Sequence, residues 1–292
     1  MTTARGVDVR STEGARAGLA GVFLKVGLPV LIGVIAVVLA ARSGGSLTAP
    51  VGHRFYELGM VIAAIAVLGY GFWQSIREGK QSKLLLMSIA AGTAFWQETY
   101  GDWGAYCLYS SQFATYTWQH TRWAAPFACW WFIAGYVVFY TSLFLALIAA
   151  VKFVRRRWPN INPYIAGALV SLPVFYVFDL AWEATTVGLG YWSYQYAFGP
   201  AMHVGGGMFP LLWPIVEQVP FMALAAFGLT WVNSRGEDVF EVAARTVTRR
   251  KPTQFGVLVS WIVLVNIAFF TTTILPLMLV RGLLGPSIPS IP

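Results

Sequence analysis

The chain has 292 residues, of which 57% are hydrophobic and only 11% are charged, and its mean hydropathy is +0.63. A soluble domain carries roughly 25% charged residues, so the composition excludes an ordinary soluble protein and indicates a polytopic membrane protein. A net charge of +8 in a soluble chain would suggest nucleic acid. In a membrane chain the charge is explained by topology, so no nucleic-acid partner is expected.

Apolar runs of membrane length predict an all-α bundle of about seven transmembrane helices. The expected spans lie near 22–41, 55–76, 82–100, 126–151, 163–187, 207–232 and 254–280. The run 82–100 is the weakest, because it ends in the polar sequence WQET. Short connections indicate a single membrane domain over 21–282. It would follow a disordered cytoplasmic segment, 1–20, and precede an extended tail, 283–292.

The distribution of basic residues predicts the orientation. With the N-terminus inside, sixteen of the twenty lysines and arginines lie on the cytoplasmic side. This positive-inside bias predicts a multi-pass protein of the inner (plasma) membrane. All three histidines and six of the twelve acidic residues then fall in the outer half of the bundle. A carboxylate in hydrocarbon costs at least about 2.5 kcal/mol, so we expect the chemistry of the protein in that half.

The two outer connections, 99–125 and 188–206, are rich in aromatic residues. The first contains four tyrosines and three tryptophans, and the second contains three tyrosines and one tryptophan. A hydrophobic lid over a cavity and an interfacial aromatic belt explain this density equally well. The stretches FWQETYGDWGAY (95–106) and AWEATTVGLGYWSY (181–194) share an aromatic-acid opening and a Gly/aromatic ending. They indicate either a weak internal repeat or chance in a Trp-rich chain.

Asp179 and Glu183 are four residues apart, so they share one helix face. Burial and like charge would raise the pKa of at least one of them. A shared proton is the physical consequence, and it makes a neutral carboxylic acid available for proton donation. The alternative is a hydrogen-bonded pair that holds helices together.

The other acidic residues give weaker signals. Glu217 lies between Pro214 and Pro220 beside Gln218, in a segment that would line a cavity or form a kinked structural helix. Glu98 and Asp102 would either complete the cavity or be solvated. Glu57, beside Arg54, favours a surface ion pair.

His120 and His203 could act as bases or metal ligands. No histidine or acidic spacing typical of a metal site accompanies them, so we expect no metal. Cys107 and Cys129 both map to the outer side, where a disulfide and two isolated buried thiols are equally plausible.

Two stretches resemble the AveC-like spirocyclases. FYVFDLAWEATTVGLGYWSYQYAFGPAMHVGGGMFPLLWPIVEQVPF (175–221) matches through its FD…E helix, Gly/aromatic exit, Gly-rich turn and Pro-x-x-Glu helix. WQETYGDW…YSSQF…W…P (96–126) matches a second region, with Glu98 where the family has Asp. The carboxylate pattern also looks like that of small membrane lycopene cyclases. Both resemblances imply a membrane-embedded, cofactor-independent acid/base enzyme, and the first implies closure of spiroketal rings, sometimes with dehydration.

We therefore expect a cyclase or dehydratase acting on a hydrophobic polyketide, terpenoid or lipid, within membrane lipid. The first-choice acid/base residues are Asp179, Glu183 and Glu217, with Glu98 and Asp102 assisting. The expected substrate-binding residues are Trp96, Trp182, Tyr191, Trp192, Tyr194, His120, His203 and Gln218. The alternative is a proton-coupled transporter or a non-enzymatic membrane subunit. A homo-oligomer or a partner membrane protein is compatible with either function.

Overall fold

The computed structural model describes residues 28–117, 121–125, 127–249 and 253–286. Over these ranges the chain is mostly helical, as expected, and it also forms two-stranded antiparallel ladders that were not expected. The ladders pair β1 with β4, β2 with β3, and β5 with β6. Segment 1–20 and residues 287–292 of the expected tail lie outside the described residues. Within the rest of that tail, 283–292, Leu283 and Leu284 are helical rather than extended.

The helices, in chain order, are α2 (Leu28–Ser43), α3 (His53–Glu78), α4 (Lys83–Thr93), α5 (Glu98–Ala105), α6 (Phe132–Arg157), α7 (Pro163–Gly188), α8 (Val219–Thr230), α9 (Val239–Thr248), α10 (Gln254–Phe269) and α11 (Leu275–Leu284). The strands are β1 (Cys107–Tyr109), β2 (Thr115–Thr117), β3 (Phe127–Cys129), β4 (Trp192–Tyr194), β5 (Ala201–Val204) and β6 (Gly207–Pro210). A 3-10 turn (Phe95–Gln97) precedes α5, and π-helical turns lie at Pro214–Gln218 and Phe270–Ile274.

Several helices begin at residues that satisfy their first backbone N–H groups. The Asn162 side chain accepts a hydrogen bond from the Tyr164 amide, and Pro163 occupies the first turn of α7. Ser82 caps α4 and Thr253 caps α10 in the same way. These capping residues fix where the helices start.

Four helical segments among the described residues are long and apolar enough to cross a membrane: His53–Glu78, Phe132–Arg157, Pro163–Gly188 and Gln254–Leu284. Helix α3 is the least buried of them and exposes Phe55, Ile65 and Ile76. Bare apolar surface of this kind suits hydrocarbon. The chain is therefore described as a membrane protein, whereas the number seven and the orientation stay predictions.

Two expected spans are not continuous helices. The run 82–100 breaks after α4, which has 11 residues. Such a helix rises only about 17 Å against a hydrocarbon core of roughly 30 Å. The run 207–232 begins as strand β6 and becomes helical only at Pro214. Both breaks lie next to the acidic residues that the sequence had marked.

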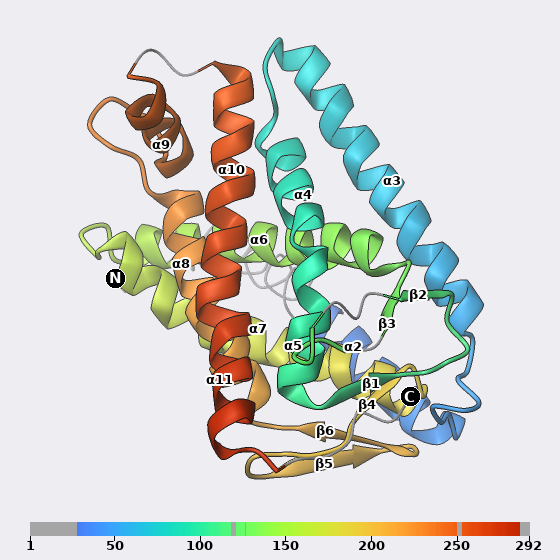
Figure 1. Ribbon diagram of the computed structural model, residues 1–292. Helices are drawn as coiled ribbons and strands as arrows, with labels where there is room; N and C mark the ends of the chain where they lie inside the picture. Colours follow the sequence, from blue (N-terminus) through green and yellow to red (C-terminus); the bar gives the residue numbers. More distant parts are fainter. Residues whose placement is uncertain (1–27, 118–120, 126, 250–252, 287–292) are drawn as a thin grey trace, which may run out of the picture.

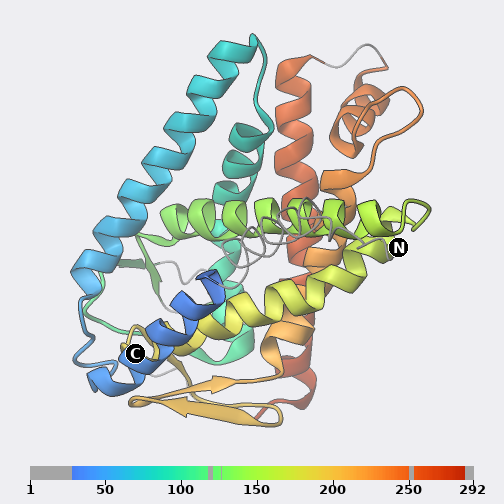
Figure 2. The ribbon, with the colours of Figure 1, turned by 180° about the vertical axis from the view of Figure 1, so that it is seen from behind.

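The helices are not all aligned. Figure 1 shows α3, α4 and the continuous α10–α11 rod standing side by side, with α6 and α7 crossing behind them. Figure 2 shows α2 lying along α7, which it contacts. Strands β1, β4, β5 and β6 gather at one end of the molecule, beside α5 and the end of α7 (Figure 1).

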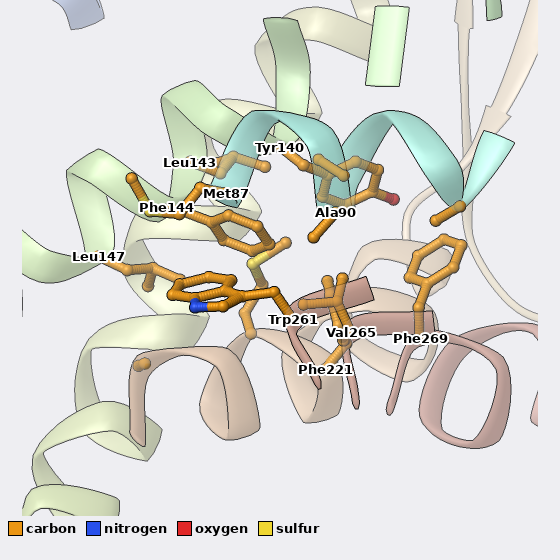
Figure 3. Packing of buried hydrophobic residues seen from close by; sticks show 14 of the residues in the cluster. Met87, Ala90, Tyr140, Leu143, Phe144, Leu147, Phe221, Trp261, Val265 and Phe269 are labelled. Carbon is orange, nitrogen blue, oxygen red and sulfur yellow. The ribbon is translucent and has the colours of Figure 1, made fainter. Parts of the chain in front are cut away.

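The main hydrophobic core joins α4, α6, α8 and α10 (Figure 3). Met87 and Ala90 of α4 meet Phe144 of α6 and Phe221 of α8 there. Trp261 of α10 stacks on Phe240 of α9, with ring centroids 3.6 Å apart. This packing holds α4 and α6 in place, and the two helices lead directly into the elements around the cavity described next.

Candidate active site

A cavity of about 80 Å³ lies where α5, α6, α7 and the β1–β4 ladder meet. Four carboxylic acids from two helices line it, and aromatic rings form most of the remaining wall. The acids are Glu98, Asp102, Asp179 and Glu183. The aromatic lining is Tyr109, Trp131, Tyr136, Phe139, Tyr140, Trp182, Trp192, Tyr194, Phe209 and Trp213.

Glu98, the first residue of α5, is held by two tyrosines. The Tyr109 hydroxyl donates to Glu98 Oε1 at 3.0 Å, and the Tyr136 hydroxyl donates to Glu98 Oε2. The side chain keeps some exposed surface where it faces the cavity. Burial raises the pKa of Glu98, and the hydrogen bonds from Tyr136 and Tyr109 partly oppose that rise. The neutral carboxylic acid therefore persists to higher pH than in water.

Tyr109 remains a donor beside this acid. Burial, together with Asp102 and Glu98, raises the pKa of Tyr109 well above its usual value. Its hydroxyl therefore keeps its proton and can orient Glu98 in either of that residue's protonation states.

Glu183 lies on α7 and is also held by two aromatic donors. The indole Nε1 of Trp192 donates to Glu183 Oε2 at 2.7 Å, and the Tyr194 hydroxyl donates to the same oxygen at 3.0 Å. Both donors come from β4, which follows α7 in the chain. The turn between α7 and β4 thus folds the chain back onto its own carboxylate.

The β1–β4 ladder brings the two sets of donors together. Cys107 pairs with Tyr194 and Tyr109 pairs with Trp192, in antiparallel register. Paired residues point to the same face of a ladder, and these four side chains all line the cavity. Parts of the two aromatic-rich connections, 99–125 and 188–206, therefore meet in one wall.

Asp102 and Asp179 bring a second acid to each side of the cavity. Asp102 follows Glu98 by one helical turn, and Asp179 precedes Glu183 by one turn. Both are buried, at 5% and 7% exposure, and both line the cavity. The expectation that Asp179 and Glu183 share a proton stays a prediction.

Aromatic rings packed against one another form much of the wall around the acids. Trp131 stacks on Trp192 with centroids 6.0 Å apart, and Trp182 packs against Phe139 with centroids 5.3 Å apart. Such walls exclude water and strengthen electrostatic interactions inside the cavity.

Three residues expected at the site are not among the lining residues. Trp96 is partly exposed and donates to Asn266 Oδ1 at 3.2 Å. Tyr191 is buried in an aromatic cluster with Tyr56 and Phe113. His203 lies exposed on β5. Trp182, Trp192 and Tyr194, by contrast, do line the cavity.

The remaining predicted residues are the acidic residues Glu217 and Glu57, Gln218, His120 and the two cysteines. Glu217 and Gln218 lie in the π-helical turn, but their side chains, like all of His120, lie outside what the structure describes. Glu57 pairs with Arg54 at 3.0 Å, as expected. Cys107 and Cys129 are buried thiols that do not form a disulfide.

Sequence reasoning missed Tyr109 and Tyr136 as partners of Glu98. Tyr136 is a hydroxyl inside an otherwise apolar predicted span, and that polar group needs a partner. Tyr109 was treated only as one of the many aromatic residues in the connection 99–125. The signal for Tyr109 is its spacing from Glu98, which equals the spacing of Tyr194 from Glu183.

Residues 76–283 match the family model described as Spirocyclase AveC-like. The chain belongs to the AveC-like spirocyclase family. The match covers α4 to α11 and hence every residue that lines the cavity. No curated protein and no solved structure matches the chain. Membership of an AveC-like spirocyclase family implies a cyclase-type enzyme.

Proposed function

We propose that this AveC-like spirocyclase is a membrane-embedded acid/base enzyme. It would catalyse spiroketal-type cyclisation or dehydration of a hydrophobic polyketide, terpenoid or lipid. The enzyme would span the inner (plasma) membrane several times, with its N-terminus inside. The substrate would reach the cavity from the surrounding lipid.

One observation carries the proposal: Glu98 and Glu183 face the same aromatic-walled cavity, and each is held by two aromatic hydrogen-bond donors. A carboxyl group held in place within a dry site is a suitable general acid or base. Two of them on one cavity supply both roles at once.

The chemistry follows from proton transfer alone. One protonated carboxyl donates to a carbonyl or a leaving hydroxyl oxygen, while an ionised carboxylate accepts the proton of the attacking hydroxyl. Loss of a hydroxyl leaves an oxocarbenium ion, and the faces of Trp182 and Trp192 stabilise positive charge by cation–π attraction. The product is a ring, with one water molecule released for each hydroxyl lost.

The cavity is small for such a substrate. Ligand sites usually measure ~300–1000 Å³, against the 80 Å³ of this cavity. The substrate therefore binds only when part of the wall moves outward.

The test compares cells that express the wild type with cells that express Glu98→Gln, Glu183→Gln or Glu78→Gln. Glutamine keeps the shape of the side chain and an acceptor oxygen but cannot exchange a proton. Glu78 is exposed at the end of α3, so Glu78→Gln is the matched control. Lipid extracts are compared by mass spectrometry after each variant is shown to be folded by size-exclusion chromatography in detergent.

We expect an isomeric or minus-water product that depends on the wild type, is lost in both site variants and survives in the control. Unchanged extracts from cells with folded protein would remove the acid/base assignment. The result would then favour the alternative functions, a proton-coupled transporter or a non-enzymatic membrane subunit.

A further inference from the structure

Each of the two carboxylates is followed, at the same distance along the chain, by a tyrosine that donates to it. Tyr109 lies 11 residues after Glu98, and Tyr194 lies 11 residues after Glu183. Both hydrogen bonds measure 3.0 Å. In both cases the carboxylate is helical and the tyrosine ends a short strand. The sequence therefore contains the same helix–turn–strand unit twice.

The strand register relates the two units by symmetry. Leu108 pairs with Ser193 at the centre of the ladder, and each residue immediately precedes the tyrosine of its own unit. An antiparallel pair in this register has a local two-fold axis through its centre. The operation that carries Leu108 onto Ser193 also carries Tyr109 onto Tyr194. Equal spacing and symmetric register are independent observations, and both relate the same residues.

The symmetry extends to the helices only in part. Each helix carries a glutamate and an aspartate one turn apart, but the order is Glu98 then Asp102 in α5 and Asp179 then Glu183 in α7. Tyr136 and Trp192, the second donors, are not related by the ladder. The repeated part is thus confined to the glutamate and its tyrosine.

We infer that the cavity consists of two half-sites built on the same glutamate–tyrosine unit, Glu98–Tyr109 and Glu183–Tyr194, whose carboxyl groups exchange the roles of acid and base between two successive ring closures. The inference rests on the proposed function and deepens it. Tyr109 and Tyr194 are the positioning residues of the two half-sites.

In such a reaction every proton moves between the substrate and the two glutamates, and none is taken from bulk water. At the start one glutamate is protonated and the other is ionised. In the first closure a substrate hydroxyl oxygen bonds to the carbonyl carbon. The first glutamate protonates the carbonyl oxygen and the second takes the hydroxyl proton, giving a cyclic hemiketal.

In the second closure the second glutamate protonates the hemiketal hydroxyl, which leaves as water. The other substrate hydroxyl bonds to the same carbon and gives its proton to the first glutamate. The spiroketal is complete, one water has been lost, and both glutamates regain their starting states. No step of this sequence takes a proton from solvent, which suits a cavity whose wall is largely aromatic.

The test uses the full chain in lipid nanodiscs and a symmetric dihydroxyketone probe whose two hydroxyls can each close a ring on the central carbonyl. Rates of spiroketal formation are compared in two matched pairs. They are Glu98→Gln with Glu183→Gln, and Tyr109→Phe with Tyr194→Phe. Tyr164→Phe, on an exposed residue, is the control.

We expect both glutamate variants to lose at least ~100-fold in rate. Both tyrosine variants should lose ~10-fold in kcat with unchanged KM, since each loses one hydrogen bond to a carboxyl group. Within each pair the losses should agree within about threefold. The tyrosine pair keeps the test valid if a glutamate variant does not fold.

Unequal losses within the tyrosine pair would overturn the inference. Removing a donor destabilises the ionised carboxylate, so the carboxyl group becomes a weaker acid and a stronger base. With one fixed acid and one fixed base, Tyr109→Phe and Tyr194→Phe would therefore change the rate by different factors. The proposed function would then survive with one fixed acid and one fixed base. A wild type that does not accelerate closure of the probe, or variants that all match it, would remove the proposed function and the inference together.

Discussion

At the scale of single residues, the acids at the site are defined by their neighbours. Glu98 and Glu57 are both glutamates that the sequence assigned to the outer half of the bundle. Glu57 binds Arg54 near the surface, whereas Glu98 receives two tyrosine hydroxyls beside the cavity. Residue type and position in the chain alone did not distinguish a surface ion pair (Glu57) from a cavity residue (Glu98) sharply. Glu98 differs from Glu57 because of contacts between distant parts of the chain, chiefly the hydrogen bond from Tyr136 of α6.

Glu98 should make the stability of the protein depend on pH. Because burial raises its pKa above 4.5, the ordinary value, folding favours its protonated form. That contribution to stability is fully present below the unfolded pKa and is lost as pH rises through the folded pKa. Thermal unfolding in detergent, followed from acidic to neutral pH, should show a smaller fall in midpoint for Glu98→Gln than for the wild type.

Glu78→Gln is again the control and should keep the wild-type profile. Parallel profiles for the wild type and Glu98→Gln would contradict the raised pKa of Glu98.

At the scale of elements, the turn after α7 brings the hydrogen-bond donors of β4 back to Glu183. Gly190, between α7 and β4, has a φ of +79°. A Cβ added there would lie 2.4 Å from the Ser46 backbone nitrogen. Only glycine fits this left-handed turn beside the end of α2. The turn is therefore part of what places Trp192 and Tyr194 against Glu183.

Gly190→Ala should lower the free energy of unfolding by ~1–3 kcal/mol and weaken the hydrogen bonds to Glu183. The matched control is Gly59→Ala in α3, where nothing lies within 4 Å of the new Cβ. It should be neutral or slightly stabilising. Chemical unfolding in mixed micelles measures both, and equal stability of the two variants would contradict this account of the turn.

Asp238 is a second structural test, remote from the cavity. It caps α9 by accepting from the Phe240 and Glu241 amides at 3.1 and 3.0 Å, and it pairs with Lys83 at 3.1 Å. Asp238→Ala should cost about 1–2 kcal/mol of stability, measured by chemical unfolding. Asp238→Asn keeps a good cap and loses only an ion pair with an exposed lysine, so it should cost less. Equal costs would show that the ion pair, not the cap, stabilises α9.

Sequence patterns predicted helices far better than ladders. The expected spans 55–76, 126–151 and 163–187 correspond to α3, α6 and α7, because long apolar runs specify long helices directly. Strands β1 and β4 have three residues each, and their pairing joins segments far apart in the chain. Local periodicity carries no information on such a pairing. The polar WQET end had marked 82–100 as the weakest expected span, but neither its break at 94–98 nor the strand at 207–210 was predicted.

At the scale of the whole molecule, the apolar exterior and the acidic cavity are complementary. The long helices α3, α6, α7 and α10–α11 expose apolar side chains, while four carboxylic acids line one cavity. The sequence predicted that these acids lie together in the outer half of the bundle. It ranked Asp179, Glu183 and Glu217 first, whereas the described contacts give Glu98 and Glu183 the clearest pair of half-sites.

The central claim is that Glu98 and Glu183 act as one acid–base unit. The most direct measurement is the rate at which the double variant, Glu98→Gln with Glu183→Gln, forms the wild-type-dependent cyclised product, compared with each single variant. Groups that act as a unit are non-additive, so the double variant should be slower than either single variant by less than about threefold. Losses that multiply in the double variant would show independent roles, and a double variant as fast as the wild type would show that neither acid takes part.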